Sequence, residues 1–315
     1  MATLEELSTR RELLAQGHRL CAGCGAPIAV RQVLLALPPE AHAVVCCPTG
    51  CLEVSTTIYP YTSWRCSYIH NAFENAAATL SGVQAMYTAL KRKGKINEDF
   101  RFVAFGGDGG TYDIGFQSLS GAMERGHRLI YVCYDNEAYM NTGIQRSGAT
   151  PRGAWTTTSP VGHVRTGKHE GRKDLTAIMA EHHVVYAAQA AISHWRDTVA
   201  KAEKAWEYAK EGPVFLNILA PCHRGWRFPM EKTIEIARLA VRTRFWPLYE
   251  VEKGEWRLTV NVANPLPVAE WLKMQGRFAH LFRGKGNEEV LAAIQADVDR
   301  QWSELMARCR SAVPA

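Results

Sequence analysis

Residues 101–110, RFVAFGGDGG, decide the fold of this chain. Residues 101–105 have the nearly unbroken apolar character of a buried strand, and residues 106–110 form a turn. A helical pattern then covers residues 112–124, and a second apolar strand covers residues 129–134. Strands this apolar are typical of a parallel sheet that is covered on both faces. This order of strand, glycine turn, helix and strand predicts an α/β fold.

The same alternation continues on both sides of this stretch. Helical patterns cover residues 5–16, 28–37, 71–90, 174–183 and 193–210, and strands are expected at residues 43–47, 184–189 and 213–219. Residues 141–173 show little periodicity, and loops this long inside a compact domain are usually functional or disordered. We therefore expect a mostly parallel sheet with helices on both faces.

The character of the sequence changes after residue 220. Five of the nine tryptophans lie in the last third, residues 252–254 suggest a hairpin, and residues 287–309 form an amphipathic helical pattern. We expect one domain over residues 1–222 and a C-terminal extension over residues 223–315. The extension either packs on its own core or wraps a partner subunit as an arm.

Composition limits the class of protein. The chain has 315 residues, 47% of them hydrophobic, with 37 basic and 31 acidic residues and a formal charge of +6. No basic stripe predicts nucleic-acid binding, and no apolar run has the ~18 residues of a membrane span. Residues 1–12 show no secretory signal, so a cytoplasmic protein is expected. In that reducing compartment nine cysteines favour metal binding or catalysis over disulfides.

The glycine turn has the features of a phosphate site. Glycines let the backbone approach a ligand closely, and the helix that follows offers free N–H groups to a phosphate. Asp108 and Asn136 each lie just past the carboxyl end of an expected strand, 28 residues apart, and such ends line the ligand crevice of α/β sheets. A hard cation such as Mg²⁺ suits Asp108, the Asn136 side chain and a backbone carbonyl near Ala138. Two unrelated turns remain the alternative.

Four cysteines form a second candidate site. Cys21 and Cys24 make a CxxC motif on a loop, Cys51 ends the segment PTGC, and Cys222 ends the segment APC. Four thiolates can hold zinc or a [4Fe–4S] cluster. Spacing alone leaves both metals open.

The other cysteines are weaker candidates. Cys46 and Cys47 are close rivals to Cys51, whereas Cys133 lies mid-strand and is expected to be a small buried side chain, as in many cores. Cys66 and Cys309 are expected to be inert. His70 is either a core histidine satisfied by the backbone or a cofactor contact.

The GDG turn, paired with DNEAYMNTG at residues 135–143, resembles the 2-oxoacid:ferredoxin oxidoreductase family. The similarity is to the thiamine-diphosphate-binding β subunit of the pyruvate-type branch, which includes oxalate oxidoreductase. It implies a thiamine-diphosphate-binding fold and Mg²⁺ held by Asp108, Asn136 and the Ala138 carbonyl. It also implies that Asn141 is the catalytic residue that touches the substrate. The cofactor-binding residues that it implies are Gly107, Asp108, Gly109, Gly110, Cys51, Asn136, Ala138 and Thr142.

The cysteine pattern resembles the same family, which carries CxGC near its start, TGC about thirty residues later and one distant cysteine after a strand. The resemblance implies a [4Fe–4S] cluster on Cys21, Cys24, Cys51 and Cys222. It implies a β subunit that oxidatively decarboxylates a small acid, oxalate or pyruvate, to CO₂ and passes electrons to ferredoxin. Whether coenzyme A takes part is left open.

The glutamate that activates thiamine is not evident in this chain. The resemblance implies that a pyrimidine-binding α-type subunit supplies it and that a further ferredoxin-like subunit takes part. A self-contained thiamine decarboxylase or carboligase with structural zinc is one rival, although 315 residues leave little room for a pyrimidine-binding domain. A non-catalytic electron-transfer subunit is the other rival, and the intact Asp108 and Asn136 argue against it.

Overall fold

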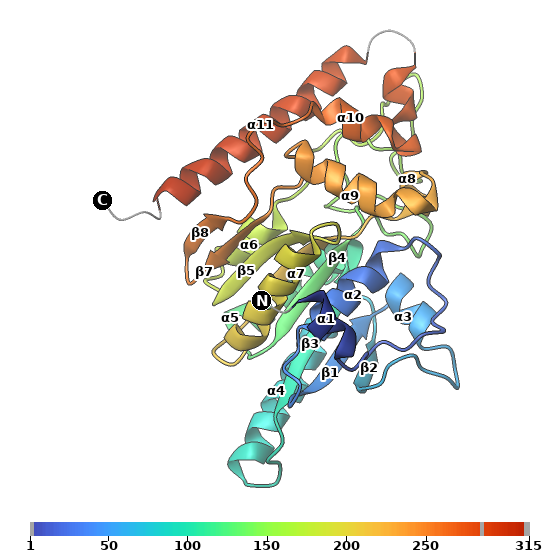
Figure 1. The fold of residues 1–315 in the computed structure, drawn as a ribbon. Coiled ribbons are helices and arrows are strands. Elements are labelled where there is room, and N and C mark those ends of the chain that lie inside the picture. Colours follow the sequence, from blue (N-terminus) through green and yellow to red (C-terminus); the bar gives the residue numbers. More distant parts are fainter. Residues whose placement is uncertain (1–2, 284–286, 312–315) are drawn as a thin grey trace.

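The computed structural model describes residues 3–283 and 287–311 (Figure 1). Its centre is an eight-stranded sheet in the order β2-β1-β3-β4-β6-β5-β7-β8. The strands are β1 His42–Pro48, β2 Ser67–Asn71, β3 Phe100–Gly107, β4 Ile130–Asp135, β5 Tyr186–Ala191, β6 Val214–Leu219, β7 Tyr249–Glu252 and β8 Glu255–Leu258. Strands β1 to β6 pair in parallel, and β7 and β8 add an antiparallel edge. The expected mostly parallel α/β fold is confirmed.

The described helices connect these strands. They are α1 Leu4–Thr9, α2 Gly25–Leu35, α3 Cys51–Thr56, α4 Ala76–Arg92, η1 Gly109–Ile114, α5 Phe116–Glu124, α6 Leu175–Ala180, α7 Trp195–Tyr208, α8 His223–Trp226, η2 Met230–Lys232, α9 Thr233–Arg242, α10 Val268–Lys273, η3 Gly276–Phe282 and α11 Glu288–Ser311. Among these described elements, none is long and apolar enough to cross a membrane.

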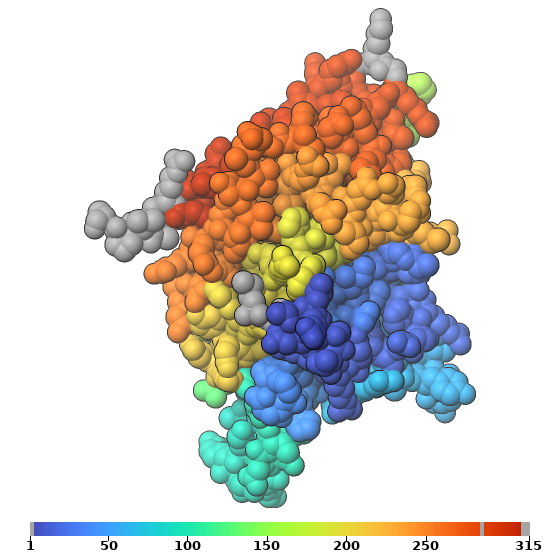
Figure 2. Space-filling view, in the orientation of Figure 1, coloured from blue at the N-terminus to red at the C-terminus, as the bar shows by residue number. Residues whose placement is uncertain are grey.

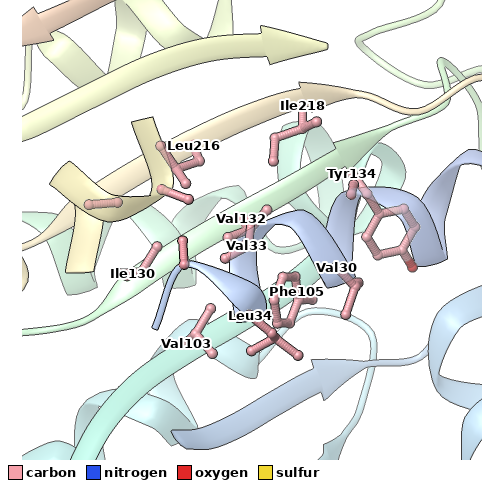
Figure 3. Packing of buried hydrophobic residues seen from close by; sticks show 14 of the residues in the cluster. Val30, Val33, Leu34, Val103, Phe105, Ile130, Val132, Tyr134, Leu216 and Ile218 are labelled. Atoms are coloured by element: carbon pink, nitrogen blue, oxygen red, sulfur yellow. The ribbon is translucent and has the colours of Figure 1, made fainter. Parts of the chain in front are cut away.

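Both faces of the sheet are covered, as the apolar strands require. Helices α2 and α7 bury one face, and Figure 3 shows Val30, Val33 and Leu34 of α2 packed on side chains of β3, β4 and β6. Helices α4, α5 and α6 bury the other face through residues such as Leu80 and Leu119. A fully buried valine or leucine side chain contributes about 1.5–3 kcal/mol to folding. These two layers hold the strand ends rigidly in place.

The strand order reverses next to β1. The chain passes from β1 to β2 on one side and returns to β3 on the other. The carboxyl ends of parallel strands lie at one edge, and ligands of open α/β sheets bind where the order reverses. The segments after β1, β3 and β4 therefore meet at the position where this fold places a ligand.

The C-terminal segment joins the same sheet. The expected hairpin is confirmed, because β7 pairs with β5 and with β8 in antiparallel register. A third core cluster contains Trp226, Trp246 and Trp271 together with Ile294 and Val298 of α11. The described part of this segment thus packs on its own chain, while the domain boundary after residue 222 stays a prediction.

Three expected elements differ from the observed ones. The helix expected over residues 5–16 ends at Thr9. The helix expected over residues 71–90 begins only at Ala76, because Ser67–Asn71 forms the edge strand β2 beside β1. The helix expected over residues 112–124 is divided into the π-helical turn η1 and α5. Residues 67–71 form a strand because they pair with β1. The helical periodicity of a sequence contains no information about such a partner strand.

Candidate cofactor and cluster site

The glycine turn sits at the carboxyl end of β3 and runs directly into the π-helical turn η1. Short π-helical turns are frequent at functional sites. A Cβ atom added at Gly109 would lie 2.5 Å from the Tyr139 ring, so no larger residue fits there without displacing that ring. The first N–H groups of the turn lack intrahelical partners, which makes them available to an anion.

Asp108 is fully buried below this turn. Its Oδ2 accepts a hydrogen bond from the Ser147 hydroxyl over 2.6 Å, and its Oδ1 accepts one from the Asn136 N–H over 3.1 Å. Burial raises the pKa of Asp108 well above its usual value, and the neighbouring Asp135 raises it further. Within residues 3–283 and 287–311, no basic side chain forms an ion pair with this carboxylate.

Three oxygen atoms converge beside Asp108. The side-chain oxygen of Asn136 lies 2.9 Å from Asp108 Oδ1 and 2.9 Å from the Ala138 carbonyl oxygen. Turned over, the Asn136 amide would instead donate hydrogen bonds to both. Adjacent ligands in an octahedral Mg²⁺ site, each ~2.0–2.1 Å from the ion, lie about 2.9 Å apart. The donor set of one carboxylate, one side-chain amide and one backbone carbonyl therefore fits a hard cation, and the 2.9 Å separations also suit hydrogen bonds from the turned amide.

The neighbouring buried carboxylates already have cationic partners. Asp135 accepts a hydrogen bond from Tyr112 over 2.7 Å and lies 3.8 Å from Arg172. Glu137 forms a buried ion pair with Arg277. An unpaired buried carboxylate is costly, and Asp108 alone of these three has no such partner among the described residues. The local charge balance thus also fits a cation at Asp108.

The segments that follow β1, β3 and β4 line one narrow pocket. Its lining residues are Thr49, Gly50, Cys51, Phe73, Gly107, Gly109, Gly110, Tyr134, Asn136, Ala138, Tyr139, Met140 and Asn141. Most of the residues that the sequence singled out for the cofactor therefore share one pocket. Asn141 is exposed at its rim, whereas Thr142 does not line it and bonds to Gln145.

The four candidate cysteines come from three separate segments. Cys24 and Cys222 occupy the N-cap positions of α2 and α8, and Cys51 is the first residue of α3. The N–H of Cys24 donates to the Cys21 carbonyl over 3.0 Å, and the Cys222 thiol accepts from the Gly225 N–H over 3.5 Å. Helix N-termini stabilise thiolates. Three of the four thiols thus lie at helix N-termini, although burial raises the pKa of each of them.

These thiols also lie close enough to affect the pKa of one another. Burial raises the pKa of Cys24 to about 12, and the thiols of Cys222, Cys51 and Cys21 each raise it further. Among the residues that the structure describes, no three His, Cys, Asp or Glu side chains are grouped as ligands of a single metal ion. The four thiols are therefore near one another without forming a single-ion site.

Hydrogen bonds to backbone carbonyls join the segment around Cys21 and Cys24 to the segment around Cys222. The N–H of Gly25 donates to the Pro221 carbonyl over 3.2 Å, and the Thr233 hydroxyl donates to the Gly23 carbonyl over 2.6 Å. Figure 2 shows the N-terminal region, in blue, lying directly against the segment that follows residue 220, in orange. A Cβ atom on Gly23 would lie 2.4 Å from the Met230 carbonyl oxygen, so this contact requires glycine.

The remaining cysteines lie apart from this group. Cys46 and Cys47 alternate across β1 and are fully buried in the two core layers, and Cys133 is buried in β4. Cys66 lines a different pocket beside Arg65 and Phe100. These surroundings are those of ordinary core or surface cysteines.

His70 lies close to the cluster segment. Its Nδ1 is 2.9 Å from Glu53, which follows Cys51 by two residues on α3. Glu53 also accepts a hydrogen bond from the Thr57 hydroxyl over 3.1 Å. His70 is thus paired with a carboxylate, which neither of the two expected roles included.

Some residues at this site carried no recognisable sequence signal. Ser147 and Thr150 come from the long loop after β4, which its lack of periodicity did mark as a functional candidate. Trp226 and Arg277 come from the C-terminal segment, and both contact the turn that follows β4. No local pattern could have connected these last two to the site.

Comparison with known proteins assigns this fold to a class of enzymes that bind thiamine diphosphate. The family profile described as "Thiamine pyrophosphate enzyme, C-terminal TPP binding domain" matches residues 48–218. The chain is 53% identical to pyruvate synthase subunit PorB of Thermotoga maritima, over 96% of this chain and 94% of the relative. It is 53% identical to PorB of Methanocaldococcus jannaschii, over 93% and 96%. It is 42% identical to ketoisovalerate oxidoreductase subunit VorB of Pyrococcus abyssi, over 92% and 91%.

A solved structure has a similar fold. The 2-oxoglutarate:ferredoxin oxidoreductase from Magnetococcus marinus aligns with a TM-score of 0.55 and 21% identity, over 76% of this chain and 81% of the other. The sequence relatives decide the family. The chain belongs to the 2-oxoacid:ferredoxin oxidoreductase family as a thiamine-diphosphate-binding β subunit, and it is one subunit of an oxidoreductase.

Proposed function

We propose that this chain binds Mg²⁺, thiamine diphosphate and one [4Fe–4S] cluster in a complex that oxidatively decarboxylates pyruvate and reduces ferredoxin. The observation that carries the proposal is the shared pocket. Cys51, a proposed cluster ligand, lines the same pocket as Gly107, Gly109 and Asn136. An electron acceptor held by Cys51 would adjoin a cofactor held by the glycine turn.

The proposed Mg²⁺ ligands are Asp108, the Asn136 side chain and the Ala138 carbonyl. The missing cationic partner of Asp108 among the described residues and the contacts of the Asn136 side chain with Asp108 and Ala138 support this assignment. The N–H groups around Gly109 and Gly110 would bind the diphosphate. Thiamine diphosphate, when bound, supplies an electron sink for decarboxylation.

The proposed cluster ligands are Cys21, Cys24, Cys51 and Cys222. Zinc–sulfur bonds of ~2.3 Å place tetrahedral thiolates about 3.8 Å apart, whereas a four-iron cluster holds its thiolates further apart. The four thiols are neighbours, since those of Cys21, Cys51 and Cys222 all act on Cys24, and the resemblance of the cysteine pattern to the family supports the cluster. Zinc also has no redox chemistry with which to accept electrons.

Asn141 is proposed to contact the substrate, because it lies at the exposed rim of the pocket. Thr142 is proposed to contact the cofactor from the loop beside this rim, where its hydroxyl now bonds to Gln145. The names of the relatives support pyruvate, because PorB subunits of pyruvate synthase are between 43% and 53% identical to this chain.

A partner subunit is proposed to supply the activating glutamate. The pocket is lined by no glutamate among the described residues. Two glutamates on segments that adjoin the pocket are engaged elsewhere, because Glu53 pairs with His70 and Glu137 pairs with Arg277. We therefore propose a cytoplasmic complex with a pyrimidine-binding α-type subunit and a ferredoxin-like subunit.

The test is an anaerobic optical spectrum of the purified complex that contains this chain. Pyruvate, oxalate and 3-methyl-2-oxobutanoate are added separately, with and without Mg²⁺ and thiamine diphosphate, in the absence of ferredoxin. Bleaching of a brown absorption by pyruvate, only when Mg²⁺ and thiamine diphosphate are both present, is the expected result. Bleaching by oxalate alone would overturn the proposed substrate.

The same samples separate the rival functions. A colourless complex that contains zinc and still releases CO₂ from pyruvate would indicate a decarboxylase or carboligase. A brown complex that does not bind thiamine diphosphate would indicate an electron-transfer subunit. Either result would overturn the proposal.

A further inference from the structure

The turn that carries two of the proposed Mg²⁺ ligands has a strained backbone. Glu137 lies between Asn136 and Ala138 and has φ of 64°, in the left-handed region. A non-glycine residue is disfavoured in that region because its Cβ atom comes too close to the following carbonyl oxygen. Such a conformation persists only when the surrounding structure fixes it.

Contacts on both sides of the turn provide this constraint. The Trp226 indole N–H donates to the Asn136 carbonyl over 2.7 Å. The Thr150 hydroxyl donates to the Glu137 carbonyl over 2.7 Å, and the Arg277 guanidinium pairs with the Glu137 carboxylate. Two successive carbonyls and the side chain between them are thus held by groups from distant parts of the chain.

Trp226 and Arg277 also support each other. The guanidinium lies 4.0 Å from the Trp226 ring centroid, and its Nε donates to the Gln275 side chain over 2.8 Å. Trp226 is fully buried and Arg277 is 2% exposed. A planar guanidinium that stacks on a ring and pairs with a carboxylate has one preferred orientation. The two side chains therefore form a rigid support below the turn.

We propose that Trp226 and Arg277 are positioning residues for the cation site. They hold the Asn136–Glu137 peptides so that the Asn136 side chain lies between Asp108 and the Ala138 carbonyl. This inference rests on the proposed Mg²⁺ and thiamine diphosphate site. Groups that orient metal ligands typically change metal affinity 10- to 100-fold when they are removed.

The same support reaches the cluster segment. The N–H of Trp226 donates to the Cys222 carbonyl over 2.9 Å, so one short helix carries Cys222 at its start and the indole at its end. The cation turn and the Cys222 loop are thus joined by a single side-chain hydrogen bond. The C-terminal segment positions both halves of the site.

The test measures cofactor binding rather than turnover. Thiamine diphosphate is titrated by calorimetry into the assembled, cofactor-stripped complex at a series of Mg²⁺ concentrations. Trp226→Phe keeps an aromatic ring for the Arg277 stack and removes the indole N–H, and Arg277→Met removes the charge. Both are expected to raise the Mg²⁺ concentration needed for half-maximal binding about 10- to 100-fold, and Arg277→Lys is expected to restore part of the affinity.

Arg244→Met is the matched control. Arg244 also belongs to the C-terminal segment, lies 4.2 Å over the Trp302 ring and donates to the Val262 carbonyl, away from the turn. Its loss is expected to lower the melting temperature without changing the Mg²⁺ requirement. If Arg277→Met does not fold, Trp226→Phe decides the test.

The outcomes distinguish the proposed function from the positioning role of Trp226 and Arg277. A wild-type complex that binds no thiamine diphosphate in the presence of Mg²⁺ overturns the proposed function. A wild-type complex that binds it, with Trp226→Phe and the folded Arg277 variants needing no more Mg²⁺ than the control, overturns the positioning role. A rise in the Mg²⁺ requirement for Trp226→Phe at an unchanged melting temperature supports it.

Discussion

The hydroxyl of Ser147 donates a hydrogen bond to Oδ2 of Asp108 over 2.6 Å and so connects the long loop after β4 to the glycine turn after β3. The same hydroxyl oxygen accepts the Ala149 N–H over 3.2 Å. One carboxylate oxygen of Asp108 is thereby engaged, and the other, Oδ1, contacts Asn136. Ser147 therefore orients the carboxylate toward the proposed cation.

Ser147→Ala is expected to weaken Mg²⁺-dependent thiamine diphosphate binding about tenfold. Leaving a buried carboxylate oxygen unsatisfied costs ~1–3 kcal/mol, and the Asp108 side chain gains freedom to rotate. Calorimetry on the assembled complex measures the effect. Thr157→Ala is the control, because the Thr157 hydroxyl bonds only to loop carbonyls of Gly143 and Ile144. Equal affinities for the two variants would contradict this role.

Replacement of a cluster cysteine is expected to remove iron from the complex. Cys51→Ser and Cys222→Ser each delete one proposed ligand, and a [4Fe–4S] cluster requires four. Iron and acid-labile sulfide are measured per complex, together with the brown absorption. Cys66→Ser is the control, because Cys66 lines a pocket elsewhere and is expected to leave the iron content unchanged. Zinc in place of iron in the wild type would refute the prediction.

Gly109→Ala is expected to abolish thiamine diphosphate binding while the chain still folds. The added Cβ would lie 2.5 Å from the Tyr139 ring, which lines the same pocket and would have to move. Gly82→Ala in α4 is the control, because nothing lies within 4 Å of its added Cβ. That change is expected to stabilise the helix by roughly 0.5–1 kcal/mol. Melting temperatures and calorimetric affinities of both variants check the pair, and normal binding by Gly109→Ala would be the contrary result.

Elements with strong local signals could be predicted from the sequence alone. The apolar strands around residues 101–105 and 129–134 and the glycine turn between them occur close to where their patterns indicate. Asp108 and Asn136 come together because both follow parallel strands that pair side by side. The resemblance to the family, and not the spacing alone, grouped the four cysteines as ligands of one cluster. In the structure the other three thiols raise the pKa of Cys24, so they lie near it.

The other elements and site residues depend on contacts between residues that are far apart in the sequence. Strand β2 is short and partly exposed, and only its pairing with β1 distinguishes it from the start of a helix. Trp226 and Arg277 are 90 and 140 positions away from the residues that they hold. A tryptophan or arginine in a C-terminal segment has many ordinary roles. The side-chain partner that makes these two residues part of the site is visible only after folding.

Lys168 is expected to make the stability of the complex depend on pH above neutrality. Its side chain is 3% exposed, and its ammonium donates to the Thr150 carbonyl over 2.6 Å and to the Gly171 carbonyl over 3.0 Å. Burial lowers the pKa of Lys168 from 10.5 to about 8. The folded chain therefore releases this proton at a lower pH than the unfolded chain does.

The sign of the effect follows from proton binding. Below pH 8 both states hold the proton, and between pH 8 and 10.5 the unfolded state holds more, so the free energy of unfolding rises with pH in that window. The stability that Lys168 contributes is thus present above 10.5 and is lost as the pH falls through 8. Melting temperatures of the anaerobic complex between pH 7 and 10 are compared for the wild type, Lys168→Met and the surface control Lys210→Met. The wild type and the control are expected to gain stability relative to Lys168→Met as the pH rises, and three parallel profiles would show that the buried ammonium does not titrate as its surroundings require.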